Sequence, residues 1–264
     1  MPSPLPAAPA ADSLPPLPPP DRSRWLRDLL AFWGVLAVFG IFYLGWGLTA
    51  LGIWAVLPAG KGSAFGRRAI ARGFRILLRL TERAGLVHLD LAALDSLRGA
   101  RGLVLVPNHL SMIDVMLVVS RVPDTVCIMK AGLERNPMLG GGRLGGYIPN
   151  SGGLSVIRRA TEALRGGANL LVFPEGTRSR DGRLGPFHPG FALIARRAGA
   201  AVQPVLIESN TRYLGKGWPF WRRPSFPLRY RVRLGERVAA AGGSEAFAEG
   251  LRRQMAARLG TALR

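Results

Sequence analysis

The sequence predicts an α/β domain in which helices flank a mixed or largely parallel sheet, preceded by an N-terminal membrane-embedded helix or helical hairpin. Short β-branched runs alternate with helical segments, which is the pattern of such a sheet. Polar motifs follow two of these runs, at the place where open α/β sheets bind ligands. Residues 29–57 carry no formal charge, and about 20 apolar residues are enough to cross a bilayer.

Periodicity and turn residues predict the individual elements of this domain. Strands are expected at 87–91, 102–107, 125–129, 169–173 and 229–234. Helices are expected at 112–119, 154–165, 190–198 and 244–263. Strands and helices therefore alternate over residues 85–264, a length that can bury a full core.

The N-terminal part of the chain divides by composition into three segments. Residues 1–24 are rich in proline, alanine and serine, and we expect a disordered tail. Residues 25–60 are the expected membrane-embedded segment, with Gly45-Trp46-Gly47 near its middle and cations on both sides. One tilted span and a broken hairpin both fit, and we favour the hairpin or re-entrant form, which leaves both ends on one side. A signal peptide is disfavoured because the apolar run is too long and has no small-residue cleavage site.

Residues 61–84 are predicted to form a basic amphipathic helix at the membrane interface. Its arginines recur at steps of four and three, so that they share one helical face opposite apolar residues: Arg68, Arg72, Arg75, Arg79 and Arg83. Beside a membrane segment, such a face suits an anionic lipid surface. The alternative is a surface helix that covers the core with solvated arginines.

Charge and cysteine content restrict the classes of function. The formal net charge is +20, and the basic residues are nearly all arginine. This charge suits an anionic membrane, an acidic donor or nucleic acid, although it can also follow genome composition. Cys127 is the only cysteine, which excludes an intrachain disulfide and a cysteine-based metal site. The three histidines lack metal-ligand spacing, so no bound metal and no cofactor are expected.

The first chemical motif is Asn-His-Leu-Ser-Met-Ile-Asp at 108–114, directly after a predicted strand. Ser111 is expected to cap the following helix, which places His109 in the loop and Asp114 in the first helical turn, where the two can meet. A neutral imidazole held by a carboxylate can remove a proton from a hydroxyl. Alternatively, Asp114 only satisfies backbone N–H groups in a capping box with Ser111, and His109 is a turn residue.

The second motif is Phe-Pro-Glu-Gly-Thr-Arg-Ser at 173–179, at the end of another predicted strand. Gly176 permits close backbone approach, Thr177 offers a hydroxyl, and Arg178 offers a planar fork for a phosphate. By itself this segment could be an ordinary surface turn with a solvated arginine.

Together, the two motifs resemble the glycerolipid acyltransferase family, whose best-known members are the 1-acylglycerol-3-phosphate (lysophosphatidate) acyltransferases. The resemblance runs from about residue 85 to residue 207. It implies that His109 is the general base and that Asp114 orients it. It also implies that four residues surround the head group of the acceptor: Glu175, Gly176, Thr177 and Arg178.

The resemblance implies a membrane-bound enzyme that moves an acyl group from acyl-CoA or acyl carrier protein to a lysolipid hydroxyl, by default 1-acylglycerol-3-phosphate. In a bacterium it would work at the cytoplasmic face of the inner membrane. No acyl-enzyme is expected, because the chain has no Gly-x-Ser-x-Gly elbow and Cys127 lies inside a predicted strand. The rival class is a membrane-tethered nucleic-acid-binding or scaffolding protein. The paired motifs and the membrane segment count against it, so no nucleic-acid partner is expected.

Two departures from the family pattern concern the acceptor. Where the family usually has a Gly-x-Ile-Phe-Ile-x-Arg block, residues 146–152 read Gly-Tyr-Ile-Pro-Asn-Ser-Gly, and the arginine is missing. His188 stands where the family commonly has a lysine. Unless Arg158, Arg159 or Arg178 replaces the missing cation, the acceptor could be another lysolipid, such as a lyso-aminolipid.

Overall fold

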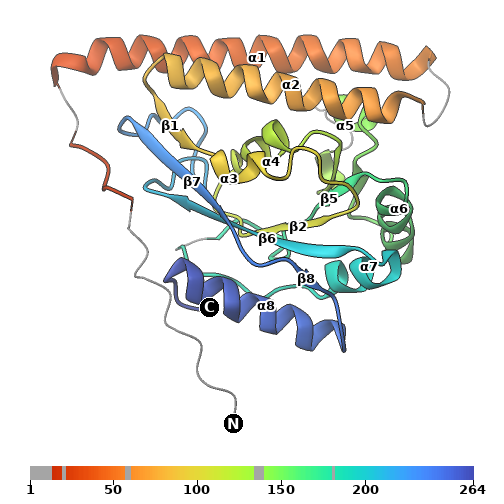
Figure 1. Ribbon diagram of the computed structural model, residues 1–264. Coiled ribbons are helices and arrows are strands. Elements are labelled where there is room, and N and C mark those ends of the chain that lie inside the picture. Colours follow the sequence, from red (N-terminus) through yellow and green to blue (C-terminus); the bar gives the residue numbers. More distant parts are fainter. Residues whose placement is uncertain (1–13, 20–21, 57–60, 134–139, 180–181) are drawn as a thin grey trace.

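The computed structural model describes residues 14–19, 22–56, 61–133, 140–179 and 182–264. Its sheet has the strand order β1-β7-β6-β2-β5-β3-β4, with β8 paired to β6 (Figure 1). The strands are β1 (Val87–Asp90), β2 (Val104–Pro107), β3 (Thr125–Met129), β4 (Ile148–Pro149), β5 (Asn169–Leu171), β6 (Ala201–Ser209), β7 (Leu228–Leu234) and β8 (Val238–Ala239). Neighbouring strands are parallel, except that β7 and β8 run antiparallel to β6. The predicted mixed, largely parallel sheet is confirmed.

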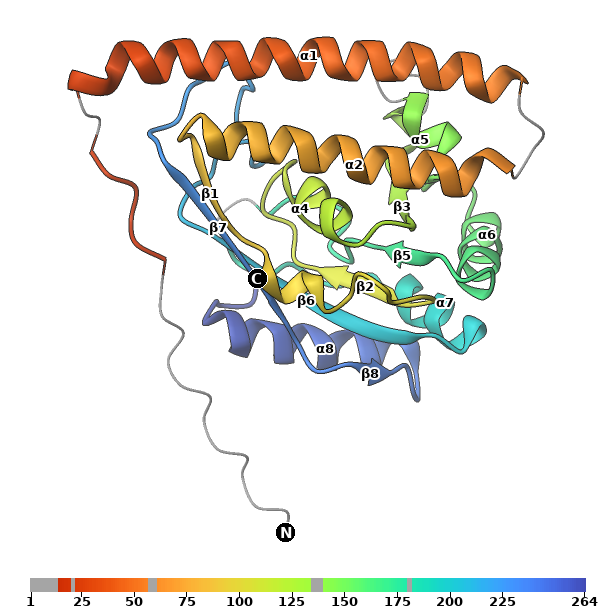
Figure 2. The same cartoon turned by 45° about the horizontal axis from the view of Figure 1, so that its top comes forward.

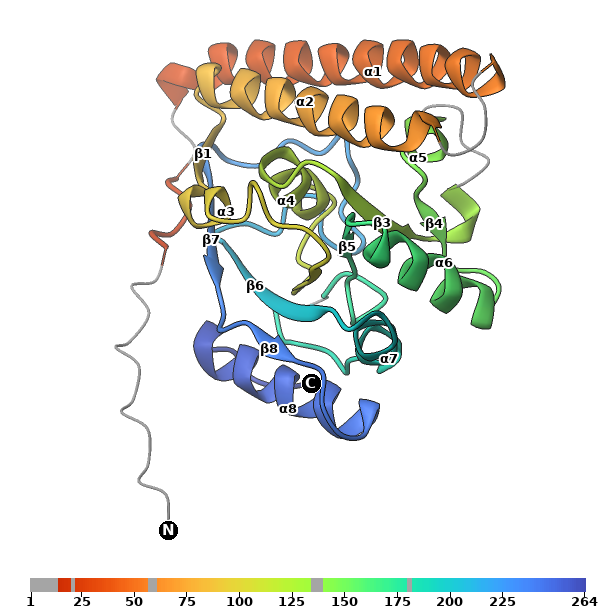
Figure 3. The same cartoon turned by 45° about the vertical axis from the view of Figure 1, so that its right-hand side comes forward.

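Helices cover both faces of this sheet. They are η1 (Arg22–Arg24), α1 (Trp25–Val56), α2 (Lys61–Arg83), α3 (Ala92–Asp95), α4 (Asp114–Arg121), η2 (Ala131–Leu133), α5 (Gly140–Leu144), α6 (Leu154–Arg165), α7 (Gly190–Ala198) and α8 (Ser244–Leu259). One face carries α3 and α4, with α1 and α2 forming a further layer above them, and α7 and α8 lie on the other face (Figures 1 and 3).

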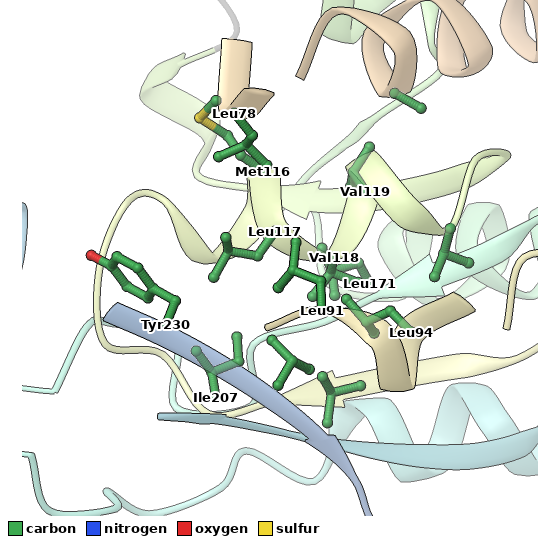
Figure 4. Packing of buried hydrophobic residues seen from close by; sticks show 14 of the residues in the cluster. Leu78, Leu91, Leu94, Met116, Leu117, Val118, Val119, Leu171, Ile207 and Tyr230 are labelled. Carbon is green, nitrogen blue, oxygen red and sulfur yellow. The ribbon is translucent and has the colours of Figure 1, made fainter. Parts of the chain in front are cut away.

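The apolar side chains pack into two clusters, one on each face of the sheet. On the α1 and α2 side, Leu78 of α2 faces Met116 of α4, and Leu117 and Val118 of α4 point toward the sheet (Figure 4). Most residues of α4 are therefore buried, between α2 above and the strands below. This packing fixes the N-terminal end of α4, where Asp114 lies.

The long apolar segment forms one continuous helix, so the predicted break at Gly45-Trp46-Gly47 is wrong. Glycine costs a helix only about 1 kcal/mol, and here close packing offsets that cost. Gly47 and Ala50 are buried, and a Cβ atom on Gly141 of α5 would overlap the Trp46 ring. The helical pair that we expected within this segment is instead formed by α1 and α2, which lie side by side (Figure 2).

The basic face predicted for residues 61–84 is present on α2. Four of its arginines are exposed, and two exposed apolar residues lie among them: Arg68, Arg72, Arg79, Arg83, Phe65 and Ile76. Arg75 differs, because its guanidinium donates from Nε and Nη2 to the carbonyl of Ser120, at 3.0 and 2.9 Å, near the end of α4.

Most of the expected disordered tail, residues 1–13 and 20–21, lies outside the described residues. The described part differs from that expectation. Residues 14–19 are extended, with Leu17 packed against the core, and the Pro15 carbonyl accepts a hydrogen bond from Asn210 at 3.1 Å. Residues 22–24 form the short helix η1.

Candidate active site

The two motifs meet because β2 and β5 are parallel neighbours. The first motif follows β2 and the second follows β5, so both leave the same edge of the sheet. The His109 ring stacks on Phe173, with 4.0 Å between ring centroids. Two backbone contacts join the turns: the His109 N–H donates to Glu175 Oε1 at 2.9 Å, and the Ser179 N–H donates to the His109 carbonyl at 2.7 Å.

His109 and Asp114 form the predicted dyad, with 2.9 Å between Nδ1 and Asp114 Oδ2. The Asp114 side chain is fully buried, whereas the His109 side chain is 17% exposed. Because a carboxylate only accepts hydrogen bonds, Nδ1 carries the proton in the neutral ring. Nε2 is then the basic nitrogen, and it belongs to the partly exposed side chain of the pair.

Asp114 also satisfies the backbone N–H groups that the alternative interpretation assigned to it. Its Oδ2 accepts from the N–H groups of Leu110 and Ser111 at 2.6 and 2.8 Å. The Ser111 hydroxyl donates to Oδ1 at 2.9 Å. The same carboxylate therefore orients the imidazole and closes the turn.

Ser111 is not the cap that the sequence predicted. The helix α4 begins at Asp114, with Ile113 as its N-cap and no side-chain capping bond. Burial explains the difference, because Ser111 is enclosed and its hydroxyl is used by the Asp114 carboxylate.

Glu175 is buried, and both of its carboxylate oxygens are occupied by protein donors. Oε1 accepts the His109 N–H, and Oε2 accepts the Ser179 hydroxyl at 3.1 Å and the Gly185 N–H at 3.0 Å. Burial raises the pKa of the Glu175 carboxyl, and these three donors oppose that shift. In this structure Glu175 holds the two motifs together.

The other residues of the second motif lie closer to solvent. Gly176 has a φ of +64°, which glycine adopts readily, and a Cβ atom there would come within 3.2 Å of the His188 ring. Gly176 and Thr177 are exposed, as is His188. The backbone of this turn is thus open to a ligand.

Arg178 is held by the segment that follows β6. Its Nη1 donates to the carbonyls of Leu214 at 2.7 Å and Gly215 at 3.1 Å. Within the described part of the chain its Nε and Nη2 make no hydrogen bond. Arg178 is therefore oriented on one side and retains donors for an anionic group.

Three neighbours of the dyad have roles that we did not predict from the sequence. Asn108 joins the motif to β6, since its side chain exchanges two hydrogen bonds with the backbone of Ile207, at 2.9 and 2.7 Å. Phe173 supplies the surface on which the His109 ring stacks. Leu214 accepts from the Met112 N–H as well as from Arg178. Asn108 and Phe173 could have been noticed, because each is the first residue of its motif, whereas no sequence pattern marks Leu214.

Arg158 and Arg159, the candidates to replace the arginine that residues 146–152 lack, both lie on the exposed side of α6. Arg158 is exposed and lies 3.9 Å from Glu162, one helical turn away. Arg159 is exposed too. Residues 146–150 form part of the sheet edge, with Ile148 and Pro149 in β4. The described residues also contain no group of histidine, cysteine and carboxylate side chains that could hold a metal.

Comparison with known proteins agrees with this geometry. Residues 88–208, which include both motifs, match the sequence model of the family described as Acyltransferase. This segment of the chain therefore resembles an acyltransferase domain. The family resemblance seen in the two motifs is thus confirmed, and the domain includes the dyad and the Glu175 turn.

Two relatives are similar to this chain in sequence, and one solved structure is similar to it in fold. The 1-acyl-sn-glycerol-3-phosphate acyltransferase BAT2 of Brassica napus chloroplasts is 32% identical over 120 residues, 43% of this chain and 35% of the relative. The lyso-ornithine lipid O-acyltransferase of Pseudomonas aeruginosa is 35% identical over 114 residues, 39% of this chain and 42% of the relative. The chain thus matches about two fifths or less of their lengths. The fold resembles the crystal structure of the LPA acyltransferase PlsC from Thermotoga maritima, with a TM-score of 0.66 and 22% identity over 89% of this chain and 94% of that one.

Proposed function

We propose that this protein transfers a fatty acyl group from an acyl thioester to a hydroxyl of a lysolipid. The observation that carries the proposal is the 2.9 Å contact between His109 Nδ1 and Asp114 Oδ2, which leaves Nε2 as the base. Relatives of the domain are named 1-acyl-sn-glycerol-3-phosphate acyltransferases, so lysophosphatidate is the first acceptor to consider and phosphatidate the product.

The geometry suits a direct transfer with general-base assistance. His109 Nε2 accepts the proton of the acceptor hydroxyl while the oxygen attacks the thioester carbonyl carbon. The new ester C–O bond forms, the C–S bond breaks, and the departing thiolate takes up the proton from His109. Asp114 stabilises the imidazolium between these two steps.

A covalent acyl-cysteine has no support in the described residues. Cys127 is fully enclosed in β3, and burial raises the pKa of its thiol to about 12. A thiol of that pKa supplies very little thiolate near neutral pH.

The N-terminal helices suit attachment to one leaflet. Among the described residues, one stretch, Arg22–Ile53, is long and apolar enough to cross a membrane. However, α1 lies along the protein body, which it contacts from Phe32 near one end to Ala50 near the other. A helix held in this way lies alongside the domain rather than projecting from it. We infer that α1 lies in the membrane plane, with its exposed apolar face in lipid and the arginines of α2 at the anionic surface.

A lyso-aminolipid is the second acceptor candidate. Residues 146–152 lack the arginine that lysophosphatidate acyltransferases usually carry there. A similar domain occurs in the lyso-ornithine lipid O-acyltransferase of Pseudomonas aeruginosa. An acceptor without a phosphomonoester has less need of that arginine.

Purified full-length protein in lipid vesicles tests the proposal. Each donor, acyl-CoA and acyl carrier protein, is combined with lysophosphatidate or lyso-ornithine lipid, and the esterified product is measured by mass spectrometry. We expect transfer that falls about 10²–10⁴-fold in His109→Ala. His88→Ala, which removes an exposed histidine of β1, is the matched control and should retain activity. Equal activity in wild type and His109→Ala would overturn the assignment of the base.

A further inference from the structure

We propose that residues 212–223, between β6 and β7, form a second membrane-contacting element that fixes Arg178 and the His109 turn when the protein is bound to an anionic bilayer. We call this segment the aromatic loop. The inference deepens the proposed function, because it concerns how the same site becomes ordered at a lipid surface. The carbonyls of Leu214 and Gly215 belong to this loop.

The tip of the aromatic loop exposes two large aromatic side chains. Phe220 is 54% exposed and Trp221 is 60% exposed. Their rings contact each other edge to face, with centroids 5.0 Å apart. Exposed rings of this size favour burial, and tryptophan is enriched at membrane–water interfaces.

Cations surround this aromatic tip. Arg212, Lys216 and Arg222 are exposed, and no carboxylate pairs with them in the part of the chain that the structure describes. The Arg222 guanidinium lies 5.1 Å from the centre of the Trp218 ring. An anionic bilayer would neutralise these charges while its interface accepts the rings.

The aromatic loop packs against α1 and reaches Trp25, an exposed residue at the start of that helix. At one end, the Arg223 guanidinium lies 5.8 Å from the Trp25 ring and donates to the Trp25 carbonyl at 3.3 Å. At the other end, Tyr213 contacts Phe32 with centroids 6.2 Å apart. The connection between β6 and β7 lies on the side of the sheet that α1 and α2 cover (Figure 1). A bilayer that covers α1 therefore reaches the loop.

The same loop contacts both catalytic motifs. The Leu214 carbonyl accepts from Arg178 Nη1 at 2.7 Å and from the Met112 N–H at 3.2 Å. Leu214 holds a φ of +56°, which is unfavourable for leucine, so the loop needs these contacts to keep this shape. A shift of the loop would move Arg178 and the turn after His109 together.

Site-specific labelling tests the membrane contact without an activity measurement. Cys127 is buried and its thiol has a raised pKa of about 12, so it does not compete for a thiol-reactive fluorophore. Trp221→Cys places the fluorophore at the loop tip. Ala246→Cys places it on exposed α8, across the sheet from α1.

Both labelled proteins are mixed with vesicles of phosphatidylcholine and phosphatidylglycerol, and binding is checked by flotation. We expect a blue-shifted emission and quenching by spin-labelled lipid at position 221 but not at 246. Vesicle-bound protein whose position 221 remains in water would overturn the proposal. A response to acidic acyl carrier protein but not to vesicles would overturn it in favour of a carrier-docking surface.

The coupling to the site is tested with the double variant Phe220→Ser, Trp221→Ser. We expect kcat/KM to fall about tenfold for an acceptor held in vesicles and to remain unchanged for a short-chain, monomeric acceptor. An equal fall for both acceptors, or none for either, would overturn the coupling. If the proposed acyl transfer itself is wrong, no acceptor is acylated by any form of the protein, whereas the fluorescence result is unaffected.

Discussion

The backbone N–H of His109 donates to Oε1 of Glu175, with 2.9 Å between the two atoms. The predicted base is thus held by a residue that the family resemblance assigned to the acceptor. Since Glu175 also accepts from Ser179 and Gly185, its buried carboxylate joins the turns after β2 and β5. Together with the Ser179 N–H bond to the His109 carbonyl and the stacking of His109 on Phe173, this side chain holds the base beside the acceptor cradle.

Glu175→Gln tests that joining role. An amide has only one oxygen, so its NH₂ group would face at least one of the three donors that the carboxylate now accepts. Leaving a buried donor unsatisfied costs about 1–3 kcal/mol, and we expect a loss of this size in the free energy of unfolding, measured by denaturant titration. Glu162→Gln, on the exposed face of α6, is the control and should change little. Unchanged stability and activity in Glu175→Gln would show that the joining contacts are dispensable.

The raised pKa of Glu175 also predicts a pH dependence of stability. In the folded protein the carboxyl keeps its proton above the ordinary value of 4.5, where the unfolded chain has already released it. The folded state therefore loses relative stability as pH rises from 4.5 to the folded pKa. We expect the wild type to show this decline and Glu175→Gln to lack it, in unfolding curves recorded across that window. A wild-type slope of the opposite sign over the same window would contradict the direction of the shift.

Ser111→Ala tests whether support of Asp114 matters for catalysis. The change removes the 2.9 Å bond from the hydroxyl to Oδ1 and the 3.2 Å bond that the hydroxyl accepts from the Ile113 N–H, and it leaves the dyad contact in place. A hydrogen bond to a charged group contributes about 1.5–3 kcal/mol, so kcat should fall roughly tenfold or more while KM changes little. Ser120→Ala is matched to it, because Ser120 is equally buried, lies in α4 just after the Ser111 turn, and donates its hydroxyl to the Leu117 carbonyl. A similar fall in kcat for both variants would mean that the effect is loss of packing in α4.

Features that depend on residues close together in the sequence could be predicted, whereas features that depend on contacts between distant segments could not. Helices α6 and α7 have the predicted bounds because local periodicity and the flanking glycines define them. The dyad was also predicted, since five residues and one turn determine it. In contrast, the contact between His109 and Glu175 depends on the pairing of β2 with β5, which no local pattern encodes.

The errors have the same origin. The glycines near Trp46 locally favour a break, but packing of α1 on α5 keeps the helix straight through them. Ser111 has the residue type of a cap, but burial beside Asp114 gives its hydroxyl another partner. In both cases a contact of the folded chain, between helices for Trp46 and within the turn for Ser111, outweighed a preference of about 1 kcal/mol.

The anchoring of α2 to the domain gives a further prediction. Arg67 Nε lies 2.5 Å from Asp124 Oδ1, and both side chains are largely buried. Arg67→Met keeps the apolar stem but leaves the Asp124 carboxylate without its partner, and breaking such a pair costs about 3 kcal/mol or more. We expect a lower melting temperature and looser attachment of α2, seen as faster amide exchange in α2. Arg68→Met alters the exposed neighbour and should have almost no effect on stability. Equal results for the two variants would assign no special role to the Arg67 pair.

Arg178 combines two roles, which can be separated by comparing two acceptors in one variant. Its Nη1 holds the carbonyls of Leu214 and Gly215, and its remaining donors are available to the acceptor. Loss of the carbonyl contacts disturbs the site for every acceptor, whereas loss of the remaining donors affects only an acceptor that carries a phosphate. A charge-assisted bond to phosphate is worth about 1.5–3 kcal/mol, or roughly ten- to a hundredfold in kcat/KM. We therefore expect Arg178→Ala to lower kcat/KM for both lysophosphatidate and a phosphate-free lysolipid, with a further ten- to a hundredfold loss for lysophosphatidate alone. Equal losses for the two acceptors would mean that Arg178 only positions the loop and does not bind the phosphate.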